Sequence, residues 1–317
     1  MNDNRTKVAL TREGNRRENV FTALDLVRGD VVPKLRDQVM LKPNFLSGDN
    51  QLASTHVDAI RGTIDFLLTT TAPPQEIIVA EGGNEAVPGE AFENFGYYAL
   101  IDEYPIPIRL VDLNQEENWE ETHILLADCS EVPVYMPKTV LDCPCTISVG
   151  VAKTHDVCVV TLALKNMIMG TLRKQDRVKM HGFCSHAERK LPREAQTLNI
   201  NLMRLSRYLC PDIAVIDGYL GLQGNGPIGT DAVDFGIAVA SADVFAADTV
   251  MAKAMGFDPL HLGLMHYANE MGYGTADLDK IDVLGTPLES VITPFKPHET
   301  VHLQLQWHEP DAMRYLT

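Results

Sequence analysis

The sequence predicts an α/β fold with a mostly parallel sheet and helices on both of its faces. Its 317 residues are 45% hydrophobic, which is enough to fill a substantial core. Short runs of high β-propensity alternate with longer amphipathic runs, and this order is typical of parallel sheets whose strands are joined by helices. We therefore expect one unit over residues 1–317, with a division into sub-lobes 1–135 and 136–317 left open.

The individual elements follow from local patterns of residue type. Strands are expected at Lys7–Thr11, Gln38–Leu41, Glu76–Ala80, Ile108–Asp112, Thr146–Gly150, Asp212–Ile216, Gly236–Val239 and Ile281–Leu284. Helices are expected at Asn15–Val27, Val57–Leu68, Arg193–Leu209 and Asp243–Met255. Ser241 or Asp243 is expected to cap the last of these helices. Asp248 lies within it and is interpreted as a satisfied core or interface carboxylate, with contact to a site as the alternative.

Composition excludes several classes of function. The chain has 27 Lys and Arg against 43 Asp and Glu, a net charge of −16, and such a charge disfavours a nucleic-acid partner. No apolar run is long enough to cross a bilayer, and the N-terminus has no apolar secretory segment. The six cysteines include no Cys-x-x-Cys pair and show no disulfide framework. We expect a cytoplasmic protein without a membrane partner, and leave open whether it forms an oligomer.

Charge is distributed unevenly along the chain. Glu76–Glu131 contains 14 acidic residues and one basic residue, whereas Lys165–Arg193 contains eight basic residues and two acidic ones. The basic segment could hold an anionic ligand, pair with the acidic segment, or face solvent as a loop.

Polar residues directly follow four of the expected strands. These groups are Lys42-Pro43-Asn44, Glu81-Gly82-Gly83-Asn84, Lys153-Thr154-His155 and Asp217-Gly218. Ligands of open α/β sheets bind beyond the carboxyl ends of the strands, so these residues are expected to meet around one pocket. Their cations suit an anionic small molecule, and a histidine there suits proton transfer near neutral pH.

Lys165 is the most informative residue of the apolar run Val157–Met169. The polar members of this run are Thr161, Lys165 and Asn166, and on a helix Thr161 and Lys165 share one face. A buried lysine without compensation is costly or has a depressed pKa, which favours a role in a site. The alternatives are that its ammonium reaches water, or that it pairs with a buried acid such as Asp217 or Asp248. Val157–Val160 has high β-propensity, so the helix is expected to begin late.

Two further motifs have weaker signals. His181, Cys184 and His186 have a spacing compatible with a metal, but histidines in polar loops are commonly solvated. Cys143 and Cys145 are a weak metal signal as well, and are interpreted instead as buried inert thiols. Five glycines lie between Gly218 and Gly229, and they predict a loop that covers a ligand near Asn225. Their Gly-x-Gly-x-x-Gly spacing is not interpreted as a dinucleotide site, because it does not follow a strand end directly or open a helix.

Several of these motifs together resemble domain-of-unknown-function family 362, over most of the chain. The matching residues are Lys42-Pro43-Asn44, Lys153-Thr-His155, Thr161, Lys165-Asn166, Gly170, His181, Asp217-Gly218, Gly224, Gly226-Pro227, Asp243, Asp248 and Met255-Gly256. Some members look like iron–sulfur proteins because they carry an added ferredoxin segment. This chain has no such cluster motif, so the resemblance does not imply an electron carrier of that kind.

A second and more distant resemblance is to the nickel-pincer lactate racemase family. His155 precedes Lys165 by 10 residues, and His181 follows it by 16. The resemblance implies that Lys165 attaches a nickel–pyridinium cofactor, that His181 ligates the metal, and that His155 is the acid or base. The chain departs from that family at Ala163-Leu164, where the family has glycines, and near Glu81–Asn84, where a second catalytic histidine is missing. A shared fold is therefore expected, not a shared reaction.

The leading hypothesis is an enzyme that binds an anionic small molecule or a metal-containing cofactor, nickel or iron, and transfers a proton. His155 and Lys165 are the expected catalytic residues, and His181 is the candidate metal ligand. The alternative is a non-catalytic binding or redox-partner protein; a second proton-transfer group opposite His155 would favour the enzyme. The expected ligand-binding residues are Lys42, Asn44, Lys153, Asn166, Asp217 and Asn225.

Overall fold

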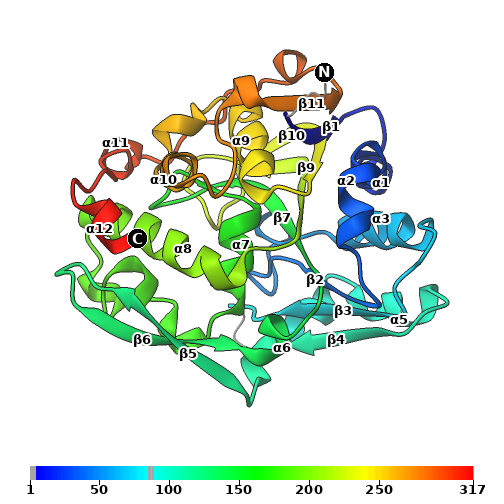
Figure 1. Ribbon diagram of the computed structural model, residues 1–317, viewed down its shortest axis with the longest axis horizontal. Coiled ribbons are helices and arrows are strands. Elements are labelled where there is room, and N and C mark those ends of the chain that lie inside the picture. The colour runs from blue at the N-terminus through cyan, green and yellow to red at the C-terminus, as the bar shows by residue number, and fades with distance from the viewer. Residues whose placement is uncertain (1–4, 85–86, 88, 317) are drawn as a thin grey trace.

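The computed structural model describes residues 5–84, 87 and 89–316 and contains one large mixed sheet (Figure 1). Its strand order is β11-β1-β10-β9-β7-β2-β3-β4, with β8 paired to β7. The strands are β1 (Thr6–Thr11), β2 (Gln38–Lys42), β3 (Glu76–Glu81), β4 (Ile108–Asp112), β7 (Thr146–Thr154), β8 (Val160–Thr161), β9 (Ile213–Leu222), β10 (Ala232–Ser241) and β11 (Ile281–Gly285). The pairs β7–β9, β2–β7, β2–β3, β3–β4 and β1–β11 are parallel, and β10 runs antiparallel to β1 and β9.

Helices cover both faces of this sheet and enclose two separate cores (Figure 1). Along β2, Val39 and Leu41 belong to one core and Met40 to the other, as the two-residue period of a strand requires. The helices are α1 (Arg16–Leu26), α2 (Arg28–Val31), α3 (Val57–Leu68), α4 (Glu90–Asn94), α5 (Leu100–Glu103), α6 (Lys138–Leu141), α7 (Ala163–Thr171), α8 (Arg193–Leu209), α9 (Val244–Ala254), α10 (Gly263–Met271), α11 (Val301–Gln304) and α12 (Ala312–Leu316). Residues of α1 and α3 fill the first core, and residues of α7 to α10 fill the second.

The predicted fold class is confirmed. Each expected strand and helix is present, and Asp243 caps α9 by accepting hydrogen bonds from the backbone N–H groups of Phe245 and Ala246. β1 lies between β10 and β11, so the first strand of the chain is part of a sheet region made of the last strands. The division into sub-lobes stays a prediction.

Two element boundaries differ from expectation in ways that matter for the site. β9 continues to Leu222 because β10 pairs with it as far as Ala232, so Asp217 lies within the strand and not at its end. β7 continues to Thr154, which places Lys153 on the strand and His155 directly after it. The apolar run that follows forms the short strand β8 before α7 begins at Ala163, as its β-propensity predicted.

A hairpin of β5 (Trp119–Leu125) and β6 (Glu131–Pro137) was not predicted. It lies at the lower edge of the view in Figure 1 and is attached to α8 through Asn201. The Asn201 side chain accepts from Leu125 N–H and donates to the carbonyl oxygens of Leu125 and Met180. One buried amide thus fixes the hairpin to the helix layer.

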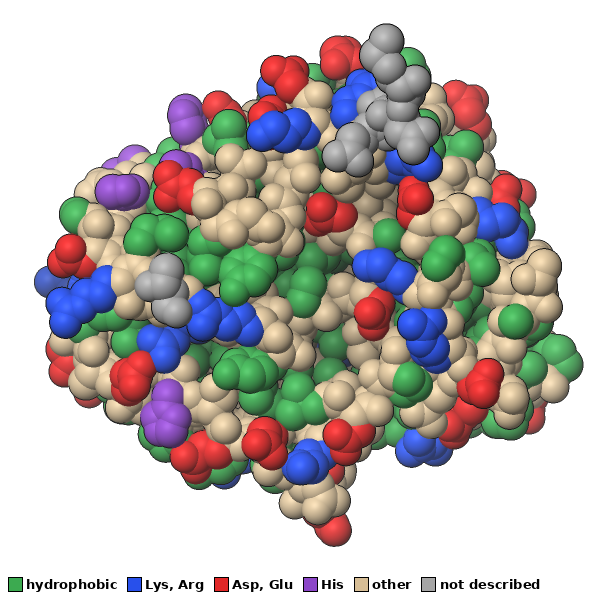
Figure 2. All heavy atoms as spheres, viewed as in Figure 1, with side chains coloured by type: hydrophobic (Ala, Val, Ile, Leu, Met, Phe, Trp, Pro, Cys, Tyr) green, Lys and Arg blue, Asp and Glu red, His purple; other side chains and the backbone are tan. Residues whose placement is uncertain are grey.

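On the face shown in Figure 2, acidic and basic side chains are interspersed and do not form separate patches. Acidic and basic side chains alternate around its rim, and hydrophobic side chains gather toward its middle. Within the described part of the chain, no helix is both long and apolar enough to span a membrane.

Candidate functional site

A cavity of about 600 Å³ lies beyond the ends of β3 and β7 and beside α7. Its wall contains six of the nine residues that were expected to be catalytic, to bind the ligand or to ligate a metal, together with residues of the basic segment and the glycine-rich loop. The first group is Asn44, Lys153, His155, Lys165, Asn166 and His181, and the second includes Lys174, Arg177, His186, Arg189, Pro227 and Ile228. The volume is in the range of small-molecule sites.

Lys42 lies behind this wall and not on it, which corrects its expected position. It ends β2, is fully buried, and forms an ion pair with Glu81 at the end of the neighbouring strand β3. Its Nζ also donates to the Pro43 carbonyl at 2.7 Å. Gly170 closes over this pair, since a Cβ there would collide with Lys42 Nζ.

Lys153 and two asparagines form a polar network inside the wall. Lys153 Nζ donates to Asn44 Oδ1 at 2.6 Å and to the Ala53 carbonyl at 2.7 Å. Asn44 Nδ2 in turn donates to Asn166 Oδ1 at 2.9 Å. Lys153 is 1% exposed, and both of its acceptors are uncharged. Burial, followed by the nearby charge of Lys165, places the pKa of Lys153 well below its usual range.

His155 and Lys165 are in direct contact. Lys165 Nζ lies 2.6 Å from His155 Nε2 and 3.4 Å from Thr161 Oγ1. His155 Nδ1 accepts from Val157 N–H at 3.0 Å, and Asp156 Oδ1 lies 3.0 Å from the same nitrogen. Burial lowers the pKa of both side chains, and the charge of Lys165 lowers that of His155 further. Neither Asp217 nor Asp248 contacts Lys165, so the expected alternative of a buried acid partner is wrong.

His181 forms a carboxylate–histidine pair with Glu194, which lies in the first turn of α8. Its Nδ1 lies 2.6 Å from Glu194 Oε1, and the pair is buried. Burial lowers the pKa of His181, and the bond to Glu194 opposes this change. The His181 and His155 rings are stacked, with centroids 6.4 Å apart and planes 19° apart. The second histidine therefore lies beside His155.

Arg189 joins the acids behind the two histidines. Its guanidinium is in contact with Glu194 and lies 3.1 Å from Asp156. Sequence reasoning did not assign a role to Asp156, Arg189 or Glu194. Arg189 belongs to the basic segment that was expected to bind an anion, whereas the position of Glu194 on a helix gave no signal.

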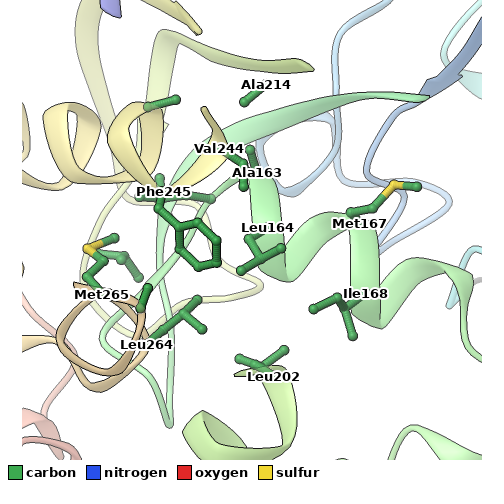
Figure 3. Packing of buried hydrophobic residues seen from close by; sticks show 14 of the residues in the cluster. Ala163, Leu164, Met167, Ile168, Leu202, Ala214, Val244, Phe245, Leu264 and Met265 are labelled. Carbon is green, nitrogen blue, oxygen red and sulfur yellow. The ribbon is translucent and has the colours of Figure 1, made fainter. Parts of the chain in front are cut away.

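The position of Lys165 is fixed by the packing and capping of α7. Asp248, which is buried on α9, accepts from the Ala163 and Leu164 N–H groups at 2.8 and 3.2 Å. α7 also presents Leu164 and Ile168 to the hydrophobic core (Figure 3). Because the helix is held at its first turn and along its apolar face, the Lys165 side chain is directed from a rigid support.

Two further residues expected to bind a ligand lie outside the wall. Asp217 is buried within β9 and pairs with Arg16 at 2.9 Å. Asn225 is exposed, and its side-chain oxygen accepts from Glu299 N–H at 3.0 Å. The glycine-rich loop does reach the cavity, but through Pro227 and Ile228. Gly226 packs there against the backbone of Thr154, where a larger residue would collide.

The candidate metal ligand His181 is engaged by a carboxylate. Among residues 5–84, 87 and 89–316, no three His, Cys, Asp or Glu side chains are grouped as ligands. His181 binds Glu194, while Cys184 and His186 are exposed nearby. The expected role of His181 as a metal ligand therefore stays a prediction.

Comparison with known proteins identifies a family for most of this fold. A family model described as "Domain of unknown function (DUF362)" matches residues 39–253, and this span contains every residue of the cavity wall. The "Thylakoid-associated protein sll1697" of Synechocystis sp. is 25% identical over 278 residues, which cover 84% of this chain and 77% of that protein.

One solved structure shows a more distant similarity. It is the lactate racemase apoprotein from Thermoanaerobacterium thermosaccharolyticum, with a TM-score of 0.49 and 12% sequence identity. The match covers 80% of this chain and 58% of the racemase chain. A similarity of this degree transfers neither a reaction nor a cofactor.

Proposed function

The chain belongs to the DUF362 family, and we propose that it is an enzyme that binds a small carboxylate in this cavity and transfers a proton to or from it. The observation that carries the proposal is the combination of two features in one wall. A buried lysine has only uncharged partners, and a buried histidine is oriented by a carboxylate.

Lys153 supplies the anion-binding group. An ammonium has three donors, and the two contacts to Asn44 and Ala53 use two of them. No carboxylate of the described residues pairs with Lys153, so its burial is uncompensated in the free protein. A carboxylate ligand would accept the third N–H and favour the charged form. Ligand binding is therefore expected to raise the pKa of Lys153 and to draw a proton from solution.

His181 supplies the proton-transfer group. When its Nδ1 donates to Glu194, the neutral ring carries its lone pair on Nε2, which no described residue engages. The lowered pKa keeps the ring neutral near pH 7, the state in which a base accepts a proton. Glu194 then stabilises the imidazolium that forms, as a carboxylate behind a histidine does in other acid–base sites.

Calorimetry tests the binding part of the proposal, with pyruvate and inorganic phosphate as probes. The wild-type protein is expected to bind pyruvate, with proton uptake visible as a dependence of the heat on the buffer. Lys153→Met removes one charge-assisted hydrogen bond, so it should weaken binding about ten- to hundredfold. His302→Gln, on an exposed residue of α11, is the control and should bind like wild type.

Proton exchange tests the catalytic part. In D2O, nuclear magnetic resonance should show deuterium entering the methyl group of pyruvate in the presence of the wild-type protein. His181→Gln and Glu194→Gln should slow this exchange by about a hundredfold or more while pyruvate still binds. Binding without exchange would instead show the non-catalytic alternative. Failure of both anions to bind the wild-type protein would refute the proposal altogether.

A further inference from the structure

We propose that Lys165 is the nucleophile of this cavity and forms an imine with the carbonyl carbon of a small α-oxo acid. The inference rests on the proposed function, because the carboxylate of that acid would occupy the site at Lys153. It adds the substrate class and a covalent step, and it follows from the contacts of Lys165.

Lys165 is enclosed without an acidic partner. Its side chain is 6% exposed, and its Nζ contacts His155 Nε2 and Thr161 Oγ1. The acids of the surrounding elements are engaged elsewhere. Asp248 binds backbone N–H groups of α7, Glu194 binds His181 and Arg189, and Asp156 lies against Arg189 and His155.

The contacts of His155 place Lys165 Nζ against a ring nitrogen and not against a carboxylate. Nζ lies 2.6 Å from Nε2, while Nδ1 faces both Val157 N–H and Asp156 Oδ1 at 3.0 Å. With the proton of the neutral ring on Nδ1, the ring donates to Asp156 and Nε2 accepts from a Lys165 ammonium; with the proton on Nε2, it donates to an uncharged Lys165 amine. The second arrangement supplies the uncharged amine that a nucleophile requires, and we take this arrangement as the reactive one.

The other two lysines near the cavity are bound as donors. Lys42 pairs with Glu81 and donates to the Pro43 carbonyl, and Lys153 donates to Asn44 and the Ala53 carbonyl. Lys165 differs from both because its Nζ contacts a ring nitrogen and a hydroxyl, and no carbonyl or carboxylate. Burial lowers the pKa of all three side chains, so these contacts and the place of Lys165 in the cavity wall are what distinguish it as a nucleophile.

The chemical step balances within the cavity. Nζ first releases its contact with His155 Nε2, which frees the lone pair of the amine. This pair forms a C–N bond with the carbonyl carbon, and the π electron pair of the carbonyl moves to its oxygen. Both protons of the amine then reach that oxygen, passed by His155 and His181. The nitrogen pair left behind forms the second C–N bond as the C–O bond breaks and water leaves. The product is a neutral imine between Lys165 and the oxo acid. Its C=N group withdraws electrons from the adjacent carbon, which assists the proton transfer assigned to His181.

Reductive trapping tests this inference. The wild-type protein is incubated with pyruvate and sodium borohydride near neutral pH, and its peptides are then analysed by mass spectrometry. Borohydride adds hydride to the imine carbon, so the expected mass gain is one oxo acid less one oxygen atom, on the peptide that carries Lys165. Lys165→Met should abolish the adduct, and Lys190→Met, on an exposed residue outside the cavity, should leave it unchanged.

If Lys165→Met does not fold, the folded and the urea-unfolded wild-type protein are compared instead. In urea-unfolded wild-type protein, Lys165 should lose its preference and react no more than the other lysines. Pyruvate that binds the folded protein without modifying Lys165, or that modifies surface lysines equally, would overturn the imine and leave the proposed function standing. Pyruvate that does not bind at all would overturn the imine, and failure of phosphate to bind as well would also overturn the proposed function.

Discussion

Asp248 makes the stability of α7 depend on pH in a way that an Asp248→Asn variant can reveal. The buried carboxylate of Asp248 accepts two backbone N–H groups at the start of the helix that carries Lys165. Burial raises its pKa to about 7, against the lowering effect of these two bonds. The folded protein thus holds a proton on Asp248 at pH values where the unfolded chain has released it.

The sign and size of the effect follow from this difference. Between the ordinary aspartate pKa of 3.8 and a folded value of about 7, the folded state binds more protons. The free energy of unfolding therefore falls as the pH rises through this window, by about 4 kcal/mol once the pH is above it. Asparagine does not ionise, but its side-chain NH2 group replaces one of the two oxygen acceptors. One of the two backbone N–H groups then faces a donor and loses its hydrogen bond. Relative to the wild-type protein with Asp248 protonated, the substitution should cost about 1–3 kcal/mol, and this cost should not vary with pH.

The two stability curves are accordingly expected to cross. At about pH 4, where the wild-type protein has lost only about 0.6 kcal/mol of this term, it should be the more stable, and at about pH 8 the Asp248→Asn variant should equal or exceed it. Urea unfolding followed by circular dichroism gives both free energies, and subtracting them removes the groups that the two proteins share. Asp311→Asn, at an exposed aspartate, reports the effect of removing a surface charge. A wild-type advantage that is the same at both pH values would refute the reasoning.

Three other substitutions test the frame of the site, each by urea unfolding. Gly170→Ala forces a Cβ against Lys42 Nζ and should lower the free energy of unfolding by about 1–3 kcal/mol. Gly29→Ala is the control, because a Cβ at that position meets open space and should cost nothing. Equal effects of the two substitutions would contradict the close packing of Gly170 over Lys42. Lys42→Met leaves Glu81 buried without its partner and should cost about 3–5 kcal/mol, with partial recovery on adding Glu81→Gln. Asn201→Ala leaves three buried backbone groups unpaired and should cost more than about 2 kcal/mol; a neutral result would mean that the hairpin does not depend on this amide.

The sequence was sufficient to predict the edge of the sheet that carries the site. Three polar residues, Lys42, Glu81 and Lys153, follow apolar runs that predict buried strands. In the structure all three lie near the ends of the neighbouring strands β2, β3 and β7. The same reasoning misplaced Asp217, because β9 continues past it. An antiparallel partner, β10, supplies hydrogen bonds beyond the point where the apolar run stops. Pairing between distant segments is not visible in a local pattern.

The contacts inside the site were less predictable than its members. His155 and Lys165 were each recognisable, but whether they touch depends on the loop and short strand between them. Glu194 was interpreted only as part of an amphipathic helix. It meets His181, which lies 13 residues earlier in the chain, and no periodicity encodes that contact. The residue types of the site were therefore predictable, whereas the partner of each residue was not.

The three buried lysines differ in whether a carboxylate pairs with them, and this difference indicates their roles. A chain with a net charge of −16 has carboxylates in excess, and it places one against Lys42. Among the described residues it places none against Lys153 or Lys165, although all three are buried to a similar degree. Uncompensated burial of a basic group is costly, so the two exceptions need a cause that Lys42 lacks. Both line the cavity and Lys42 does not, which favours a ligand as the missing partner.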